Sequence, residues 1–132
     1  MKFPILNISL KNWNNEDLDY SLILLENDVI YTTDEYIYSN YLLNNKYIDS
    51  EGKIYRIIGK ELPASWKKMF RFIPNFYKIK LIFEKTDDSL SVEDVKNYIR
   101  NNINKFNYIE DFEKEWLKII ENATTYEQVL QI

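Results

Sequence analysis

The chain contains no cysteine and no histidine, and these two absences exclude most of the familiar site chemistry. Without cysteine there is no disulfide, no thiol nucleophile and no thiolate metal site. Without histidine the commonest general base and the commonest metal ligand are missing, which nearly excludes zinc. The sequence therefore favours binding over a reaction, and we expect neither a metal nor a cofactor.

Glycine is also scarce. Gly52 and Gly59 are the only two, so no phosphate-cradling loop and no dinucleotide-binding fingerprint is present. Paired carboxylates do occur, at Asp17/Asp19, Asp34/Glu35 and Asp87/Asp88. Such pairs can hold a divalent cation or cleave a glycosidic bond, although acids at these positions are more often solvated turn or cap residues. An enzyme that uses carboxylates and a divalent metal stays open as an alternative.

Long apolar runs are missing. The longest, Leu22–Leu25, is far too short to cross a bilayer, and the first residues do not read as a signal peptide. A chain of 132 residues is the size of one domain. We expect a single cytoplasmic domain over residues 1–132 with no membrane span. The abundance of Ile, Asn, Lys and Tyr is typical of an AT-rich bacterial genome.

Residues 1–86 read mostly as β-structure, because Tyr, Ile, Phe and Val gather between Asn, Asp and Gly. Predicted strands are Phe3–Leu10, Tyr20–Leu25, Val29–Thr33, Glu35–Leu42, Lys46–Asp49, Lys53–Gly59 and Phe76–Lys85. The last has the clearest alternation, with apolar side chains on one face and mostly charged ones on the other. Asp49–Gly52 reads as a hairpin turn.

Helical periodicity appears later in the chain. A short helix is predicted near residues 63–73, between Pro63 and Pro74. Residues 91–132 read as helical, with Ser91 capping the first helix and a second helix near Ile109–Glu121. Thr124 and Glu127 have the spacing of a capping box for a short third helix. The predicted fold is therefore α+β, an antiparallel sheet from the N-terminal two-thirds packed on one face by two to three C-terminal helices.

Charge is sorted along the chain. Residues 1–52 have three basic and nine acidic side chains, for a net charge of −6. Residues 53–85 have nine basic and two acidic ones, for +7, and residues 86–132 have five and ten, for −5. If the blocks segregate on the surface, they steer encounters with charged macromolecules. If they interleave, they cancel, and the sequence does not decide between the two.

Two stretches are candidate binding surfaces. The acidic arm combines carboxylates with tyrosines that supply rigid contact area, and its candidate residues are Asp28, Tyr31, Asp34, Glu35, Tyr36, Tyr38 and Tyr41. An ordinary Tyr-rich strand pair with a charged turn explains the same residues. The alternative basic surface, for nucleic acid or an anionic membrane, comprises Trp66, Lys67, Lys68, Arg71, Lys78 and Lys80. Because the net charge is negative and no nucleic-acid motif is present, we do not expect nucleic acid as the partner.

The order of parts from about Tyr41 onward resembles that of small bacterial immunity proteins, which are encoded beside polymorphic toxins. The stretches that carry the resemblance are Tyr47–Tyr55, Phe76–Glu84, Ser91–Lys96 and Asn122–Glu127. The resemblance implies a cytoplasmic, non-enzymatic protein that binds and blocks a cognate protein toxin. It gives no functional residues and no oligomeric state.

Overall fold

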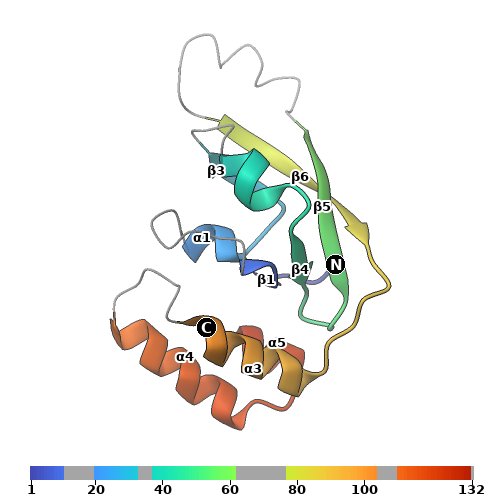
Figure 1. Cartoon of the computed structure of the whole chain (residues 1–132). Helices are drawn as coiled ribbons and strands as arrows, with labels where there is room; N and C mark the ends of the chain where they lie inside the picture. Colours follow the sequence, from blue (N-terminus) through green and yellow to red (C-terminus); the bar gives the residue numbers. More distant parts are fainter. Residues whose placement is uncertain (11–19, 33–36, 62–76, 104–109, 132) are drawn as a thin grey trace.

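The computed structural model describes residues 1–10, 20–32, 37–61, 77–103 and 110–131. Their elements are β1 (Ile5–Asn7), α1 (Tyr20–Ile23), β2 (Leu24–Leu25), β3 (Val29–Thr32), the π-helical turn η3 (Tyr38–Leu42), β4 (Lys46–Ile48), β5 (Ile54–Glu61), β6 (Tyr77–Lys85), α3 (Val92–Asn102), α4 (Glu110–Asn122) and α5 (Tyr126–Leu130) (Figure 1). The α+β class is confirmed. The helix predicted near 63–73 lies outside the described residues.

The strands form one antiparallel sheet in the order β2-β1-β4-β5-β6-β3. Its two outermost strands are consecutive in the chain, since only residues 26–28 separate β2 from β3. Four peptide units reach at most about 14 Å, so the two ends of the sheet must come close together. The sheet is therefore strongly curled.

Side chains on the two faces of the sheet meet different elements. Leu6, Ile48 and Ile54 are buried neighbours across β1, β4 and β5. Their face of the sheet lies toward α3, because Ile54 and Tyr98 of α3 line the same cleft. The C-terminal helices group at one end of the sheet (Figure 1). On the opposite face, the buried Tyr47 hydroxyl donates to the Leu22 carbonyl in α1 at 2.6 Å. The C-terminal helices thus pack on one face, as predicted, and α1 covers part of the other.

The predicted turn between β4 and β5 is confirmed and tied down at several points. The buried Asp49 carboxylate accepts backbone N–H bonds from Glu51 and Lys53 within the turn and from Lys2 at the N-terminal segment. Gly52 has φ +85°, a conformation that a Cβ disfavours. The turn is therefore a fixed part of the structure.

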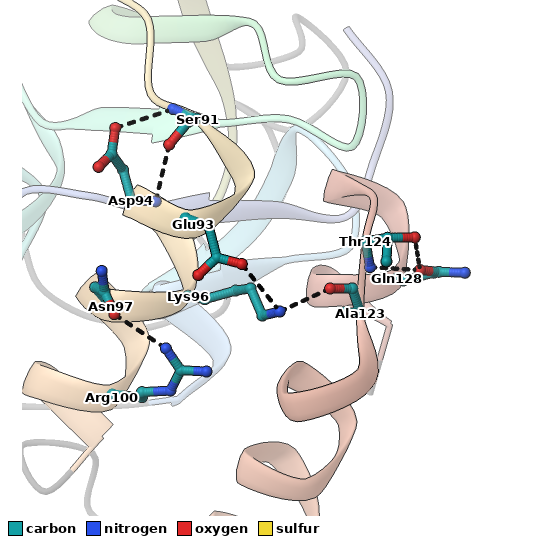
Figure 2. A network of polar contacts seen from close by, with 9 residues as sticks. All are labelled: Ser91, Glu93, Asp94, Lys96, Asn97, Arg100, Ala123, Thr124 and Gln128. Carbon is teal, nitrogen blue, oxygen red and sulfur yellow. Dashed lines mark hydrogen bonds and ion pairs between the residues drawn. The ribbon is translucent and has the colours of Figure 1, made fainter.

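The three C-terminal helices are joined by polar contacts at their ends. Ser91 and Asp94 form the capping box of α3. One turn later, the buried Lys96 ammonium donates to the Ala123 carbonyl at 2.7 Å, just past the end of α4 (Figure 2). A cation is favourable at a helix C-terminus, where the backbone carbonyls lack partners. Trp116 of α4 donates its indole N–H to the Val129 carbonyl of α5.

Two predicted strands are wrong. The first is Tyr20–Leu25, which forms α1 and then the two-residue β2. The predicted strand Phe3–Leu10 is present but shorter, since only three of its residues pair as β1. The second wrong strand is Glu35–Leu42. The described part of Glu35–Leu42 is η3. Its buried residues Tyr38, Tyr41 and Leu42 stand at i, i+3 and i+4, so a helical turn places all three toward the core, where a strand would turn some outward.

The predicted cap of the last helix is displaced by one residue. The side chain of Thr125, not of Thr124, accepts the Gln128 backbone N–H at 3.2 Å and begins α5. The Gln128 side chain reaches back to the Thr124 backbone N–H at 2.8 Å. The predicted partner Glu127 lies in the first turn and pairs with Lys2 instead.

Candidate functional site

A cleft of about 440 Å³ lies beside β6 and is the strongest candidate for a binding site among the described residues. Its lining residues come from the N-terminus, the approach to β3, and strands β5 and β6: Met1, Asp28, Tyr55, Glu61, Lys80, Leu81, Ile82 and Phe83. The cleft therefore joins parts of the chain that are far apart in sequence.

Apolar side chains are exposed next to this cleft. The pairing of β5 with β6 shifts between Ile57 and Gly59, so Ile58 is the extra residue of a β-bulge and its side chain is 46% exposed. Ile82, opposite Gly59, is 38% exposed. The Ile82 side chain lies close to Gly59, with its Cδ1 atom 3.7 Å from the position a Cβ would take. The strand pair thus presents two adjacent isoleucines to solvent.

Charged groups surround these isoleucines. Arg56 of β5 and Glu84 of β6 are opposite in register and form an ion pair at 3.0 Å. Glu61 and Lys80 are opposite each other further along. Asp28 lies next to β6 because its carbonyl accepts the Leu81 backbone N–H at 2.7 Å. An apolar centre with a mixed charged rim is the usual anatomy of a protein–protein contact surface.

The charge blocks interleave where the structure describes them. Strand β3, from the acidic block, pairs with β6, from the basic block, so that Tyr31 stands opposite Lys78 and Val29 opposite Lys80. Lys2 and Lys46 of the first block form ion pairs with acids of the third block. Along these contacts the blocks cancel more than they segregate.

A second cleft, of about 470 Å³, lies between the sheet and α3. Its polar groups include Lys46, Asp88 and Tyr98, with Ile8, Ile54, Ser89 and Leu90 completing the lining. Lys46 holds the pKa of the Asp88 carboxyl below its ordinary value, first by a hydrogen bond and then by its positive charge. Burial raises the pKa of the Tyr98 hydroxyl, which accepts the Leu10 backbone N–H. These polar groups already have partners within the fold.

Ionisable groups buried in the described part of the chain serve the fold. Asp49 holds the β4–β5 turn and Lys96 holds the end of α4, each with its charge met by hydrogen bonds. Burial raises the pKa of the Tyr47 hydroxyl, which bonds to a backbone carbonyl. No three acidic side chains gather at metal-binding distance among the described residues. Of the predicted carboxylate pairs, only Asp87/Asp88 is described, and Asp88 is held by Lys46.

The structure divides the predicted acidic arm. Asp28 lies at the β6 cleft, and Tyr31 lies in β3. The rings of Tyr38 and Tyr41 are only 5% exposed, and Tyr38 packs against the Lys60 ammonium at 4.3 Å from its ring centroid. The expectation of exposed contact rings is therefore wrong for these two, because η3 turns them into the core. Asp34, Glu35 and Tyr36 lie outside the described residues.

The predicted basic surface is described only in β6. Lys78 and Lys80 are two residues apart in that strand, and Lys80 reaches the cleft beside Glu61 and Asp28. Trp66, Lys67, Lys68 and Arg71 lie outside the described residues.

Sequence reasoning missed Ile58, Ile82 and Met1. Ile82 carried a signal, since it is the apolar exception on the outward, charged face of the β6 alternation, between Lys80 and Glu84. Two consecutive isoleucines before Gly59 hint at a bulge, because glycine inside a strand often marks one. The position of Met1 at the cleft depends on the paired N-terminal segment and has no local signal.

Comparison with protein-family models, with curated proteins and with solved structures finds no match in any of the three. In the described part of the chain, each helix is too short or too polar to traverse a bilayer.

Proposed function

We propose that this chain is a cytoplasmic, non-enzymatic immunity-type protein that binds a cognate protein toxin. It blocks the toxin by covering the active site or a surface beside it. The observation that carries the binding role is the exposed apolar surface of β5 and β6: Ile82 lines the β6 cleft, Ile58 is exposed in the neighbouring strand β5, and charges of both signs border them. Burying these side chains removes apolar surface from water, which is the main favourable term in most protein–protein association.

Asp28 adds a carboxylate to this surface from the segment before β3. Together with the overall charge of −4, it suits a partner that carries Lys or Arg at the contact. Association would then begin with charge attraction and end with burial of the isoleucines. In this mechanism the rim charges set the rate of encounter, and the apolar centre sets the lifetime of the complex.

The first test is a pull-down of the tagged chain from its native lysate at low and at moderate salt, with bound protein and nucleic acid both analysed. A stoichiometric, basic protein that is toxic when expressed alone and harmless when co-expressed with this chain would support the proposal. Recovery of nucleic acid alone, lost as salt rises, would overturn it in favour of the basic surface.

The surface is tested with two matched substitutions on the captured partner. Ile82→Glu places a charge at the apolar centre, and we expect its affinity to fall by at least about tenfold. Ile119→Glu is the control, because Ile119 is also exposed, at 37%, but lies on α4. Equal affinities of the two variants would exclude this face as the contact surface.

The role of Asp28 is tested by association rates. Asp28→Lys is expected to slow association at low salt by roughly tenfold and to lose this effect as salt rises. The control Asp87→Lys makes the same change of charge at an exposed residue between β6 and α3. An unchanged rate for Asp28→Lys would remove charge steering at the cleft from the mechanism.

A further inference from the structure

Strand β6 has a neighbour on both sides over only part of its length. It pairs with β5 from Lys80 to Lys85, whereas β3 pairs with it only from Tyr77 to Lys80. The last contact on the β3 side is the bond from the Leu81 N–H to the Asp28 carbonyl. Beyond it, no described strand pairs with this edge of β6. In Figure 1, β6 ends at the outer margin of the molecule, away from β3.

The backbone groups on this free edge follow from the register. In an antiparallel pair, successive residues turn their N–H and C=O groups alternately to one neighbour and to the other. Leu81 turns its N–H toward β3, and Thr86 turns its N–H to the Ile54 carbonyl of β5 at 2.9 Å. Phe83 and Lys85 therefore direct both backbone groups to the free edge, while Glu84 directs its own to β5.

The free edge is held in an extended conformation. The Phe83 ring packs edge-on against the buried Tyr47 ring, with centroids 6.2 Å apart. On the other side of the strand, Glu84 pairs with Arg56, and the Thr86 hydroxyl donates to the Ile54 carbonyl. An edge that is already extended loses little conformational entropy when another chain pairs with it.

We propose that the free edge of β6 at Phe83 and Lys85 accepts an extended segment of the partner protein as an added strand. This inference rests on the proposed function. The N–H and C=O groups of Phe83 and Lys85 on this edge can form hydrogen bonds with another extended backbone. Such main-chain hydrogen bonds supply affinity in β-augmentation. The cleft lies along the same edge, and its residues Asp28 and Ile82 would contact the side chains of the added strand.

Charge and apolar surface define the chemistry of that segment. An apolar side chain of the segment would lie against Ile82, and a Lys or Arg would lie near Asp28 and Glu61. The lysine at position 85 limits how far a foreign strand can pair along β6, because lysines are a usual protection of sheet edges. The added strand is therefore short.

The test uses the full chain and the protein captured by it from the native lysate, together with overlapping 15-residue peptides that cover that protein. Lys85→Pro removes the N–H that faces the free edge, and proline is tolerated where a strand N–H faces solvent. Lys85→Ala keeps the N–H and controls for the side chain. We expect Lys85→Pro to lose about tenfold in affinity for the captured protein and for one peptide, and Lys85→Ala to lose less than twofold.

Hydrogen exchange on the unaltered chain keeps the test decisive if Lys85→Pro fails to fold. Binding is expected to slow exchange of the Phe83 and Lys85 amides at least tenfold. A captured toxin that binds both variants equally, or leaves these two amides unprotected, would overturn the added strand and leave the proposed function intact. If no toxic protein is captured, the proposed function fails first. A wild-type dimer that Lys85→Pro dissociates would make the occupant a second copy and also overturn the inference.

Discussion

Gly52 is the residue at which the β4–β5 turn touches the last helix. Its φ of +85° disfavours a side chain, and a Cβ there would clash with the Tyr126 ring. Tyr126 cannot easily move away, because its hydroxyl donates to the Leu90 carbonyl at 2.5 Å. The turn and α5 therefore fit together only with glycine at this position.

We expect Gly52→Ala to destabilise the protein by roughly 1–3 kcal/mol, since it combines backbone strain with overpacking. Urea unfolding gives the free energy. Gly59→Ala is the matched control, because its Cβ would meet only Ile82 at an ordinary 3.7 Å. Equal losses in the two variants would contradict the assigned role of Gly52.

Lys46 and Asp88 form an exposed ion pair, which can be detected from the pKa of the Asp88 carboxyl. We expect Lys46→Met to raise the pKa of Asp88 toward its ordinary value, because both the hydrogen bond and the positive charge are removed. NMR titration of the carboxyl measures the change. The lowered pKa means that the pair stabilises the fold above the ordinary carboxyl pKa and loses this effect as pH falls through the lowered one. If Asp88 has the same pKa in Lys46→Met as in the unaltered chain, the ion pair does not persist in solution.

At the scale of single elements, α5 depends on its first residue. Thr125→Ala removes the acceptor for the Gln128 N–H and is expected to cost about 1 kcal/mol of unfolding free energy. Thr124→Ala removes only an exposed side-chain contact to Gln128, so we expect it to cost less than half as much. Thermal unfolding of the two variants side by side compares them. A larger loss of unfolding free energy in Thr124→Ala than in Thr125→Ala would favour the capping box of Thr124 and Glu127 that the sequence predicts.

Elements with a long periodic pattern were predictable and short ones were not. The alternation in β6 and the apolar stripes of α3 and α4 each span at least nine residues, and the existence and type of these elements are confirmed. In segments 20–25 and 35–42, which are rich in aliphatic or Tyr residues, the sequence pattern favoured strands. There tertiary packing decided instead, because the buried side chains reach the core from short helical turns.

The candidate site was less predictable than the fold. Asp28 and Lys80 were named from sequence for two different surfaces, and the pairing of β3 with β6 brings them to one cleft. That pairing joins residues about fifty positions apart, which local patterns do not reveal. The same holds for Ile58, whose exposure follows from a shift in strand register.

For the whole molecule, two tyrosines with raised pKa values, Tyr47 and Tyr98, contribute to the response to alkaline pH. Burial raises the pKa of Tyr47 and Tyr98, so both stay protonated in the folded chain after their unfolded counterparts ionise. Their contribution to stability is complete below the ordinary tyrosine pKa of about 10 and is lost as pH rises above it. We expect the unfolding free energy to fall with pH in this range, and Tyr98→Phe to make the fall less steep. Urea unfolding at several pH values measures the slope, and an unchanged slope in Tyr98→Phe would contradict this account.

The short link from β2 to β3 holds the two ends of the sheet close together, as a disulfide would in a chain that contains cysteine. Its three residues connect opposite ends of the sheet order, so the curl cannot open while both strands stay paired. Lengthening that link would leave the core residues unchanged yet let β2 and β3 separate from the sheet independently of each other. Each residue of β3 that separated would lengthen the free edge of β6, so residues 26–28 determine how much of that edge stays unpaired.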